Sequence, residues 1–128
     1  MTVWVTGGNG MLGGEVTHAL KRAGITVVAT DMEIDITDIA SLHRFVTTTG
    51  PFEWIVNCAA WTAVDAAEDN EEAARILNAD GPANLAQVAA ETGGCLMHIS
   101  TDYVFDGMRY KPYSEFDIVS PAGVYGKT

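Results

Sequence analysis

Basic residues are scarce in this sequence, which has 7 Lys and Arg against 17 Asp and Glu and a formal net charge of −10. Without a basic stripe to neutralise phosphates, the composition argues against nucleic acid or an anionic membrane surface as partners. No apolar run approaches the roughly 20 residues of a membrane-spanning helix. No secretory signal is visible either, because the chain enters a strand-and-glycine pattern at once. We therefore expect a cytoplasmic protein that binds neither nucleic acid nor membrane.

Cysteine is nearly absent as well, with Cys58 and Cys95 as the two in the chain. Both lie in apolar runs typical of strands, where free thiols behave as small hydrophobic side chains. Two such residues do not make a disulfide framework, and no Cys and His residues have the spacing of a metal site. We expect no bound metal.

Strand and helix patterns alternate along the 128 residues. Short β-branched and apolar runs alternate with stretches whose apolar residues recur at helical spacing. The predicted strands cover residues 2–6, 26–30, 54–57 and 95–100, and the predicted helices cover 11–23, the stretch from 39 to Gly50-Pro51, and most of 62–91. This alternation predicts one α/β domain over residues 1–128 with a Rossmann-type, doubly wound parallel sheet. We expect the sheet to be incomplete and to stop after about the fifth strand.

Local signals mark the ends of the predicted helices. Gly24 is expected to end the first helix, and Asp38 or Thr37 to cap the second. The third region is predicted to hold a short helix and then a long one with Asn70 as its N-cap. Gly81-Pro82 is expected to bend or interrupt that long helix.

A glycine-rich turn with Gly7, Gly10 and Gly13 at spacings of three follows the first predicted strand. Without Cβ atoms, the chain can turn tightly at Gly7 and admit a pyrophosphate near Gly10, while Gly13 lets the helix lie close to the strand. Amides at the start of that helix would face the phosphates. The alternative is a glycine-rich turn without a ligand, but its place between a strand and an amphipathic helix favours a dinucleotide-binding site.

Acidic residues after the second predicted strand bear on the choice of cofactor. The carboxylate of Asp31 is placed to accept hydrogen bonds from the adenosine ribose and would repel a 2′-phosphate. No Arg or Lys stands near the ends of the first two strands to bind that phosphate. NADH or NADPH is therefore the expected cofactor, with NADH slightly favoured. Asp35 and Ile36 lie in a loop within reach of the adenine, although a solvated loop before a helix cap explains them almost as well.

Three longer motifs resemble one family. They are Asn57–Asp65 (NCAAWTAVD), Ser100–Gly107 (STDYVFDG) and Pro121–Thr128 (PAGVYGKT). In this order and spacing they closely resemble the dTDP-4-dehydrorhamnose reductases, a branch of the extended short-chain dehydrogenases. The resemblance covers essentially the whole chain, and it implies the N-terminal, cofactor-binding part of such a reductase.

The resemblance also implies roles for individual residues. The residues it places along the cofactor are Gly10, Met11, Leu12, Ala60, Trp61, Thr62 and Tyr125. It assigns catalysis to Thr101 and Tyr125, and it places Thr101, Asp102 and Tyr103 beside the substrate. Taken alone, a Thr that ends a strand is often a turn former, and Tyr125 could be a packing aromatic.

The implied reaction is reduction of the C4 keto group of a nucleotide-sugar, dTDP-4-dehydro-6-deoxy-L-mannose, in dTDP-L-rhamnose synthesis. The nicotinamide performs the redox step. Tyr125 would donate a proton to the developing alkoxide as general acid. Thr101 would hydrogen-bond the same oxygen and hold the carbonyl in place.

The sequence departs from the family's pattern in several places. The family has a Lys one helical turn after its catalytic Tyr, a position that would follow Thr128, and Lys127 is too close to Tyr125 to replace it. The later strands and the lobe that grips the nucleotide-sugar are absent. We therefore expect a fragment with little or no reductase activity and a tendency to form homo-oligomers over its exposed sheet edge. Gly123 stands where the family commonly has Asn, and it is expected to loosen the approach to Tyr125.

Two other functions stay open at this point. A nucleotide-sugar epimerase or dehydratase of the same superfamily would use the same cofactor turn, and Asp102 partly fits a dehydratase. A non-catalytic subunit, similar to the regulatory subunit of methionine adenosyltransferase, would use the fold for association.

Two further groups are expected to be structural. The acidic run 68–72 has the composition of a solvated helix start, where acids suit the helix dipole. His98 is expected to be a core or strand-end histidine and not a catalytic base.

Overall fold

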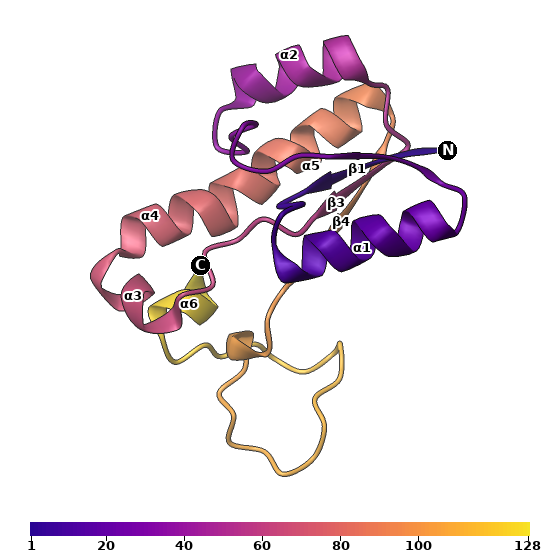
Figure 1. Cartoon of the computed structure of the whole chain (residues 1–128). Helices are drawn as coiled ribbons and strands as arrows, with labels where there is room; N and C mark the ends of the chain where they lie inside the picture. Colours follow the sequence, from indigo (N-terminus) through magenta and orange to yellow (C-terminus); the bar gives the residue numbers. More distant parts are fainter.

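The computed structural model describes all residues from 1 to 128 and has a parallel sheet with helices on both faces (Figure 1). The strands are β1 (Thr2–Thr6), β2 (Thr26–Ala29), β3 (Trp54–Asn57) and β4 (Cys95–His98). They run in the order β2-β1-β3-β4, and every neighbouring pair is parallel. The predicted α/β class and Rossmann-type sheet are confirmed. The sheet has four strands, one fewer than the approximate number expected.

Helices connect the strands and cover the sheet. They are α1 (Met11–Arg22), α2 (Ile39–Thr49), α3 (Val64–Asp69), α4 (Glu71–Arg75), the π-helix η1 (Ile76–Asp80), α5 (Gly81–Thr92), the 3₁₀ turn η2 (Asp102–Val104) and α6 (Val124–Lys127). Helices α2 and α5 pack together on one face of the sheet, and α1 covers the other (Figure 1). None of them is both long enough and apolar enough to cross a membrane.

The predicted signals at two helix ends are confirmed. Asp38 caps α2, because its Oδ1 accepts hydrogen bonds from Ala40 N at 2.9 Å and Ser41 N at 3.2 Å. These bonds satisfy two of the amides that have no partner inside the helix. Gly24 follows the end of α1 with a φ of +74°, a left-handed conformation that glycine adopts without strain.

The core on the α2 and α5 face is built around Trp4, which is fully buried in β1. Its ring centroid lies 4.7 Å from that of Phe45 and 5.5 Å from that of Phe52. The indole Nε1 donates to Thr30 Oγ1 at 2.8 Å. The one polar atom of this large side chain is thereby satisfied, which avoids a desolvation penalty of about 1–3 kcal/mol.

The expected long helix differs from the prediction in its middle. Asn70 occupies the predicted N-cap position of α4, but its side chain makes no capping bond, because its Nδ2 donates to Ala66 O at 2.8 Å. The interruption at Gly81-Pro82 takes the form of the π-helix η1, after which the chain continues directly into α5. Pro82 cannot donate a backbone hydrogen bond and would crowd a regular preceding turn, so a wider turn there accommodates its ring.

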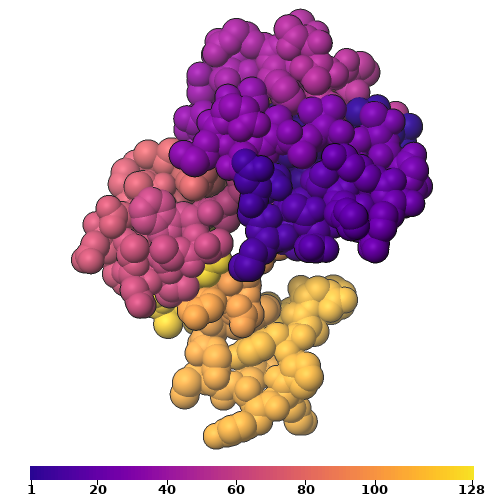
Figure 2. All heavy atoms as spheres, viewed as in Figure 1, coloured from indigo at the N-terminus to yellow at the C-terminus, as the bar shows by residue number.

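A loop of residues 105–123 projects from the body below the sheet (Figure 2). The rings of Phe105 and Tyr113 stack at 4.1 Å, and Tyr113 Oη donates to Asp106 Oδ1 at 2.8 Å. An ion pair joins Arg109 and Asp117 across the loop. These contacts brace the loop internally, although it holds no helix or strand.

Helix α1 begins against the turn that follows β1. A Cβ added at Gly13 would overlap Gly7 O, so the backbone of the helix touches the backbone of the turn. A Cβ added at the next residue, Gly14, would lie 3.7 Å from Gly8 O, which is an ordinary contact. The close packing therefore depends on Gly13 and not on its neighbour.

Gly13→Ala is expected to lower the free energy of unfolding by about 1–3 kcal/mol, because the turn must move to admit the methyl group. Gly14→Ala is the matched control and is expected to leave that energy unchanged or to raise it by up to about 1 kcal/mol, since Ala is the better helix former. Urea unfolding followed by tryptophan fluorescence measures both. Equal stability of the two variants would contradict the close packing at Gly13.

Candidate functional site

The turn between β1 and α1 brings backbone segments together without side chains between them. Gly7 has a φ of +66°, and a Cβ added there would lie 2.7 Å from Ala59 N. Gly10 donates its N–H to Gly7 O at 3.0 Å and stands at the N-cap of α1, where no side chain caps the helix. The first amides of α1 are therefore available to an anion, at the helix end where negative charge is favoured.

A hollow of about 620 Å³, which we call the turn cleft, lies beside this turn. The predicted cofactor residues that line it are Gly7, Gly10, Asp31, Asp35, Ile36 and Ala60. Six others are not part of its lining: Met11, Leu12, Gly13, Trp61, Thr62 and Tyr125. Of these, Met11 is 94% exposed at the start of α1. The structure therefore brings about half of the predicted set together around one hollow.

Asp31 holds the turn as well as lining the cleft. Its Oδ2 accepts a hydrogen bond from Asn9 N at 2.8 Å, and its Oδ1 accepts one from Met32 N at 3.0 Å. The carboxylate is therefore fixed beside the glycine turn and keeps lone pairs for a further donor. No Lys or Arg lines the turn cleft to offset its charge.

Asp35 and Ile36 line the cleft and also stabilise the loop before α2 and the core beside it. Asp35 Oδ1 accepts from Thr37 N at 2.8 Å and from Thr37 Oγ1 at 2.7 Å, which braces the loop before α2. Ile36 is 4% exposed, and a Cβ added at Gly81 would lie 2.7 Å from its Cδ1. Ile36 is therefore mainly a core residue that packs against the start of α5.

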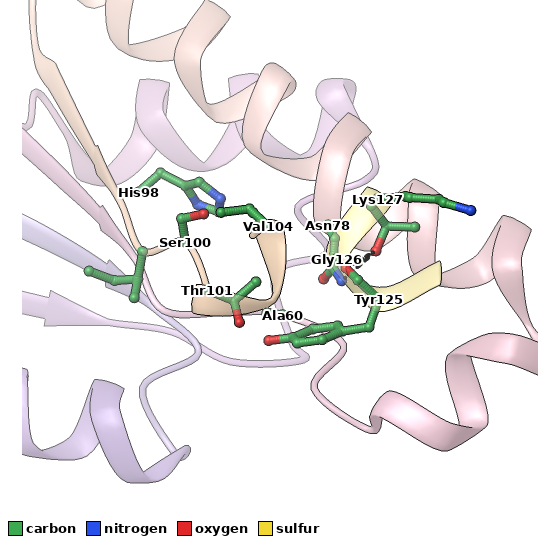
Figure 3. Close-up of a pocket in the computed structure, with 11 residues that line it drawn as sticks. Ala60, Asn78, His98, Ser100, Thr101, Val104, Tyr125, Gly126 and Lys127 are labelled. Carbon is green, nitrogen blue, oxygen red and sulfur yellow. Dashed lines mark hydrogen bonds between the residues drawn. The ribbon is translucent and has the colours of Figure 1, made fainter. Parts of the chain in front are cut away.

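A second hollow of about 250 Å³, which we call the Tyr125 cavity, lies beyond the end of β4. Thr101 and Tyr125 both line it, although they are far apart in the sequence (Figure 3). The Tyr125 hydroxyl points toward Thr101 in Figure 3. Two hydroxyl groups thus converge on one cavity, as donation to a single substrate oxygen requires.

Thr101 also caps the turn η2, which agrees with the alternative that a Thr at a strand end is a turn former. Its Oγ1 accepts from Tyr103 N at 3.2 Å at the start of η2, and it donates to Asp102 Oδ1 at 3.3 Å. Asp102 and Tyr103 are exposed and do not line the Tyr125 cavity. Tyr103 instead packs its ring edge-on against Tyr125, with centroids 5.4 Å apart.

The two hollows share one residue, Ala60, which lines both the turn cleft and the Tyr125 cavity. Ala60 follows the end of β3, the strand between β1 and β4 in the sheet. The glycine turn and the Thr101–Tyr125 pair therefore lie on either side of the same β3 end, at the carboxyl edge where ligands bind in open α/β sheets.

Helix α6 carries Tyr125 and is held by contacts from distant segments. Val124 is buried with Ala67 and Ala74 of α3 and α4. A Cβ added at Gly126 would overlap Tyr103 O, so α6 lies directly on the η2 backbone. The Lys127 side chain points away from the Tyr125 ring (Figure 3), in agreement with its spacing in the sequence.

A polar network that the sequence analysis did not assign crosses three strand ends beside the site, with Thr6 and Asn57 buried and His98 exposed. Thr6 Oγ1 donates to Asn57 Oδ1 at 2.6 Å, and Ala59 N donates to the same oxygen at 3.1 Å. Asn57 Nδ2 lies 3.0 Å from His98 Nδ1. Because an amide nitrogen only donates, this His98 nitrogen accepts and the ring carries its proton on Nε2. Burial lowers the pKa of His98, which favours that neutral form.

Asn78 is a second residue that the sequence analysis missed. It lies in η1, and its Oδ1 accepts from Trp61 N at 2.7 Å while its Nδ2 donates to Trp61 O at 3.1 Å. The same Nδ2 donates to Thr128 Oγ1 at 3.2 Å. Asn78 therefore ties the segment after β3 to the segment after α6, and it lines the Tyr125 cavity itself.

The thiol and metal chemistry of the site is limited. Cys58 lines the turn cleft, and burial raises the pKa of its thiol, so it contributes an uncharged side chain to the lining. No group of three or more His, Cys, Asp or Glu side chains is arranged to hold a metal ion.

Comparison with known proteins gives a family and several close relatives. The family model described as RmlD substrate binding domain matches residues 1–128, the whole chain. The dTDP-4-dehydrorhamnose reductase of Streptomyces griseus is 46% identical over 125 residues, which are 97% of this chain and 41% of that protein. The corresponding reductase of Mycobacterium tuberculosis (strain ATCC 25618 / H37Rv) is 41% identical over 129 residues, again 97% of this chain and 41% of the relative. The chain thus spans less than half the length of these relatives.

Solved structures agree with this assignment. A dTDP-4-dehydrorhamnose reductase from Clostridium acetobutylicum has a TM-score of 0.94 at 43% identity. The match covers 99% of this chain and 45% of the reductase chain. One from Bacillus anthracis, solved in complex with NADP, has a TM-score of 0.92 at 37% identity, over 98% of this chain and 45% of that chain. A UDP-glucose 4-epimerase from Thermotoga maritima, at 21% identity, a TM-score of 0.90 and coverage of 99% and 47%, shares the fold. The resemblance seen in the three motifs is confirmed, and the chain belongs to the RmlD substrate binding domain family.

Proposed function

We propose that this chain is the dinucleotide-binding part of a reductase that acts on dTDP-4-dehydro-6-deoxy-L-mannose in dTDP-L-rhamnose synthesis. The observation that carries the proposal is the place of Ala60, which lines both the turn cleft and the Tyr125 cavity. A dinucleotide bound with its pyrophosphate near Gly10 would run past Ala60 toward Thr101 and Tyr125. The names of the relatives, dTDP-4-dehydrorhamnose reductases, support the substrate class.

The turn cleft fits the chemistry of a dinucleotide. No side chain covers the amides at the start of α1, so they can donate to pyrophosphate oxygens. Asp31 provides acceptors for ribose hydroxyls, and Asp35 lies in the lining within reach of the adenine. Ile34 and Ala59 add apolar surface to the lining, against which a flat base can rest. We propose NADH or NADPH as the cofactor, with NADH favoured by the charge of Asp31.

In the proposed mechanism, the chain supplies a proton and a hydrogen bond at one substrate oxygen. When bound, the nicotinamide supplies the hydride. Tyr125 donates its phenolic proton to the C4 oxygen of the sugar as negative charge develops there. Thr101 turns its hydroxyl hydrogen from Asp102 Oδ1 to the same substrate oxygen and holds the carbonyl in place. Asp102 and Tyr103, which follow Thr101 directly but do not line the Tyr125 cavity, are proposed to contact the part of the substrate that lies outside it.

The rival assignment to an epimerase has weaker support. Epimerase structures such as the Thermotoga maritima enzyme share 21% identity with this chain, whereas the named reductases share 37–46%. Such low identity speaks for the common fold and not for a common reaction.

The first test is cofactor choice in the 128-residue chain. NADH is expected to bind more tightly than NADPH, because the Asp31 carboxylate would repel a 2′-phosphate. Asp31→Asn retains an oxygen that can accept from Asn9 N but removes the charge, so we expect NADPH binding to strengthen by about 3- to 10-fold. Asp65→Asn on α3, an exposed acidic residue away from the cleft, is the control. Nicotinamide fluorescence titration gives all the dissociation constants.

Two outcomes of this titration would count against the proposal. If neither dinucleotide binds a chain shown to be folded by circular dichroism, the turn cleft is not a cofactor site. If Asp31→Asn leaves the ratio of the two dissociation constants unchanged, the ribose role of Asp31 is wrong.

The second test concerns catalysis in the whole protein that contains these residues. Tyr125→Phe removes the proton donor but keeps the ring that packs on Tyr103, so kcat is expected to fall by about 10²–10⁴-fold. The dissociation constant for NADH should change less than about threefold, as a lone hydroxyl contributes little to a large ligand. Tyr110→Phe, at a fully exposed side chain in the loop, is the control. A Tyr125→Phe enzyme with nearly unchanged kcat would exclude Tyr125 as the acid.

A further inference from the structure

We propose that Glu68 is the positioning residue for Tyr125, because it caps the helix that carries this tyrosine. Glu68 lies near the end of α3, and its Oε1 accepts a hydrogen bond from Val124 N at 2.9 Å. Val124 is the first residue of α6. The acidic run that contains Glu68 is therefore not simply a solvated helix start, since its first member contacts a segment 56 residues away.

Helix α6 needs this contact because it lacks a cap of its own. Its N-cap residue Gly123 has no side chain to accept from the first amides. The first amides of a helix have no partner inside it, so here they depend on a group from another segment. An ionised carboxylate that accepts from a backbone amide makes one of the stronger hydrogen bonds of this kind.

The space at Gly123 is matched to Glu68. A Cβ added at Gly123 would lie 2.9 Å from Glu68 Oε1, and no other atom lies within 4 Å of it. The backbone of Gly123, with φ of −104° and ψ of 171°, is one that any residue can adopt. A side chain at position 123 would therefore meet the end of the Glu68 side chain and no backbone atom, and it would displace the carboxylate from its place beside Val124 N. Glu68 Oε1 lies in the space that a Cβ at position 123 would take.

The cap acts on Tyr125 through one peptide bond. Tyr125 follows Val124 directly, and its ring lies edge-on to Tyr103 at 5.4 Å. Glu68 does not line the Tyr125 cavity, so it does not contact the reacting groups. Its importance for catalysis rests on the proposed role of Tyr125 as the proton donor, but its effect on α6 does not.

The test is NMR spectroscopy of the 128-residue chain and its variants. Glu68→Ala is expected to shift the Val124 amide resonance, to weaken the Tyr103–Tyr125 ring contacts seen as nuclear Overhauser effects, and to reduce hydrogen-exchange protection in α6 about fivefold. Glu68→Gln keeps an acceptor oxygen and should retain most of these features. Glu71→Ala, at an exposed acidic residue at the start of α4, is the matched control and should change none of them.

A rescue variant separates capping from general destabilisation. In Glu68→Ala/Gly123→Asn, the crowding carboxylate is gone and the introduced side chain supplies a local cap, since Asn at an N-cap accepts from the second or third amide of its own helix. The double variant is expected to restore the Tyr103–Tyr125 contacts and the protection of α6, but not the wild-type resonance of the Val124 amide. Gly123→Asn alone should displace the Glu68 carboxylate from Val124 N, because its Cβ meets Oε1.

The outcomes divide clearly. Unchanged Tyr103–Tyr125 contacts in Glu68→Ala, or a double variant no better than the single one, would overturn the proposal. Glu68→Ala could also unfold the whole chain. In that case, a double variant that regains the fold and the ring contacts supports the proposal, and one that does not regain them overturns the proposal. NADH titration of the same samples tests the proposed function separately. If the wild-type chain does not bind the cofactor, the proposed function is refuted, but the conclusion that Glu68 holds α6 is unaffected.

Discussion

The whole site depends on a close approach of backbones at the carboxyl edge of the sheet, where Gly7 meets Ala59 and Gly13 meets Gly7. No side chain fits between these segments, so α1 starts immediately beside the ends of β1 and β3. Its free amides are thereby directed at the turn cleft, and Ala60, one residue beyond the contact, is held between the two hollows. The positions of the α1 amides and of Ala60 follow from this meeting of three segments.

Polar contacts below this edge keep the strand ends in register. Thr6, Asn57 and His98 are paired across β1, β3 and β4, and their side chains form one hydrogen-bonded row. Thr6 and Asn57 are each 1% exposed, so a missing partner would cost about 1–3 kcal/mol for each unsatisfied group. The row also binds Ala59 N, and it therefore links strand pairing to the shape of the cleft.

Local patterns were sufficient for the parts of the fold that depend on neighbours in sequence. The apolar run of β3, the cap of α2 by Asp38 and the left-handed Gly24 all followed from residues within one turn or strand. The Thr101–Tyr125 pair came from motif resemblance, and the structure places both residues on one cavity. Asn78 was missed because its partner Trp61 is 17 residues away and helical periodicity does not reveal such a bond. Glu68 was assigned to solvent for the same reason, since a carboxylate on a short helix gives no local sign of a distant amide.

The π-helix η1 joins α4 and α5, which would otherwise form one long helix, and it determines the directions in which their side chains face. Before it, α4 turns Ala74 toward α6, and after it, α5 turns Leu85 and Val88 into the core against the sheet. Each residue of an α-helix advances by about 100°, so an extra residue in a wide turn rotates everything that follows by that amount. Loss of one residue from η1 would leave both halves helical while facing one of them the wrong way. The number of residues in η1 thus sets the direction in which α5 faces relative to α4.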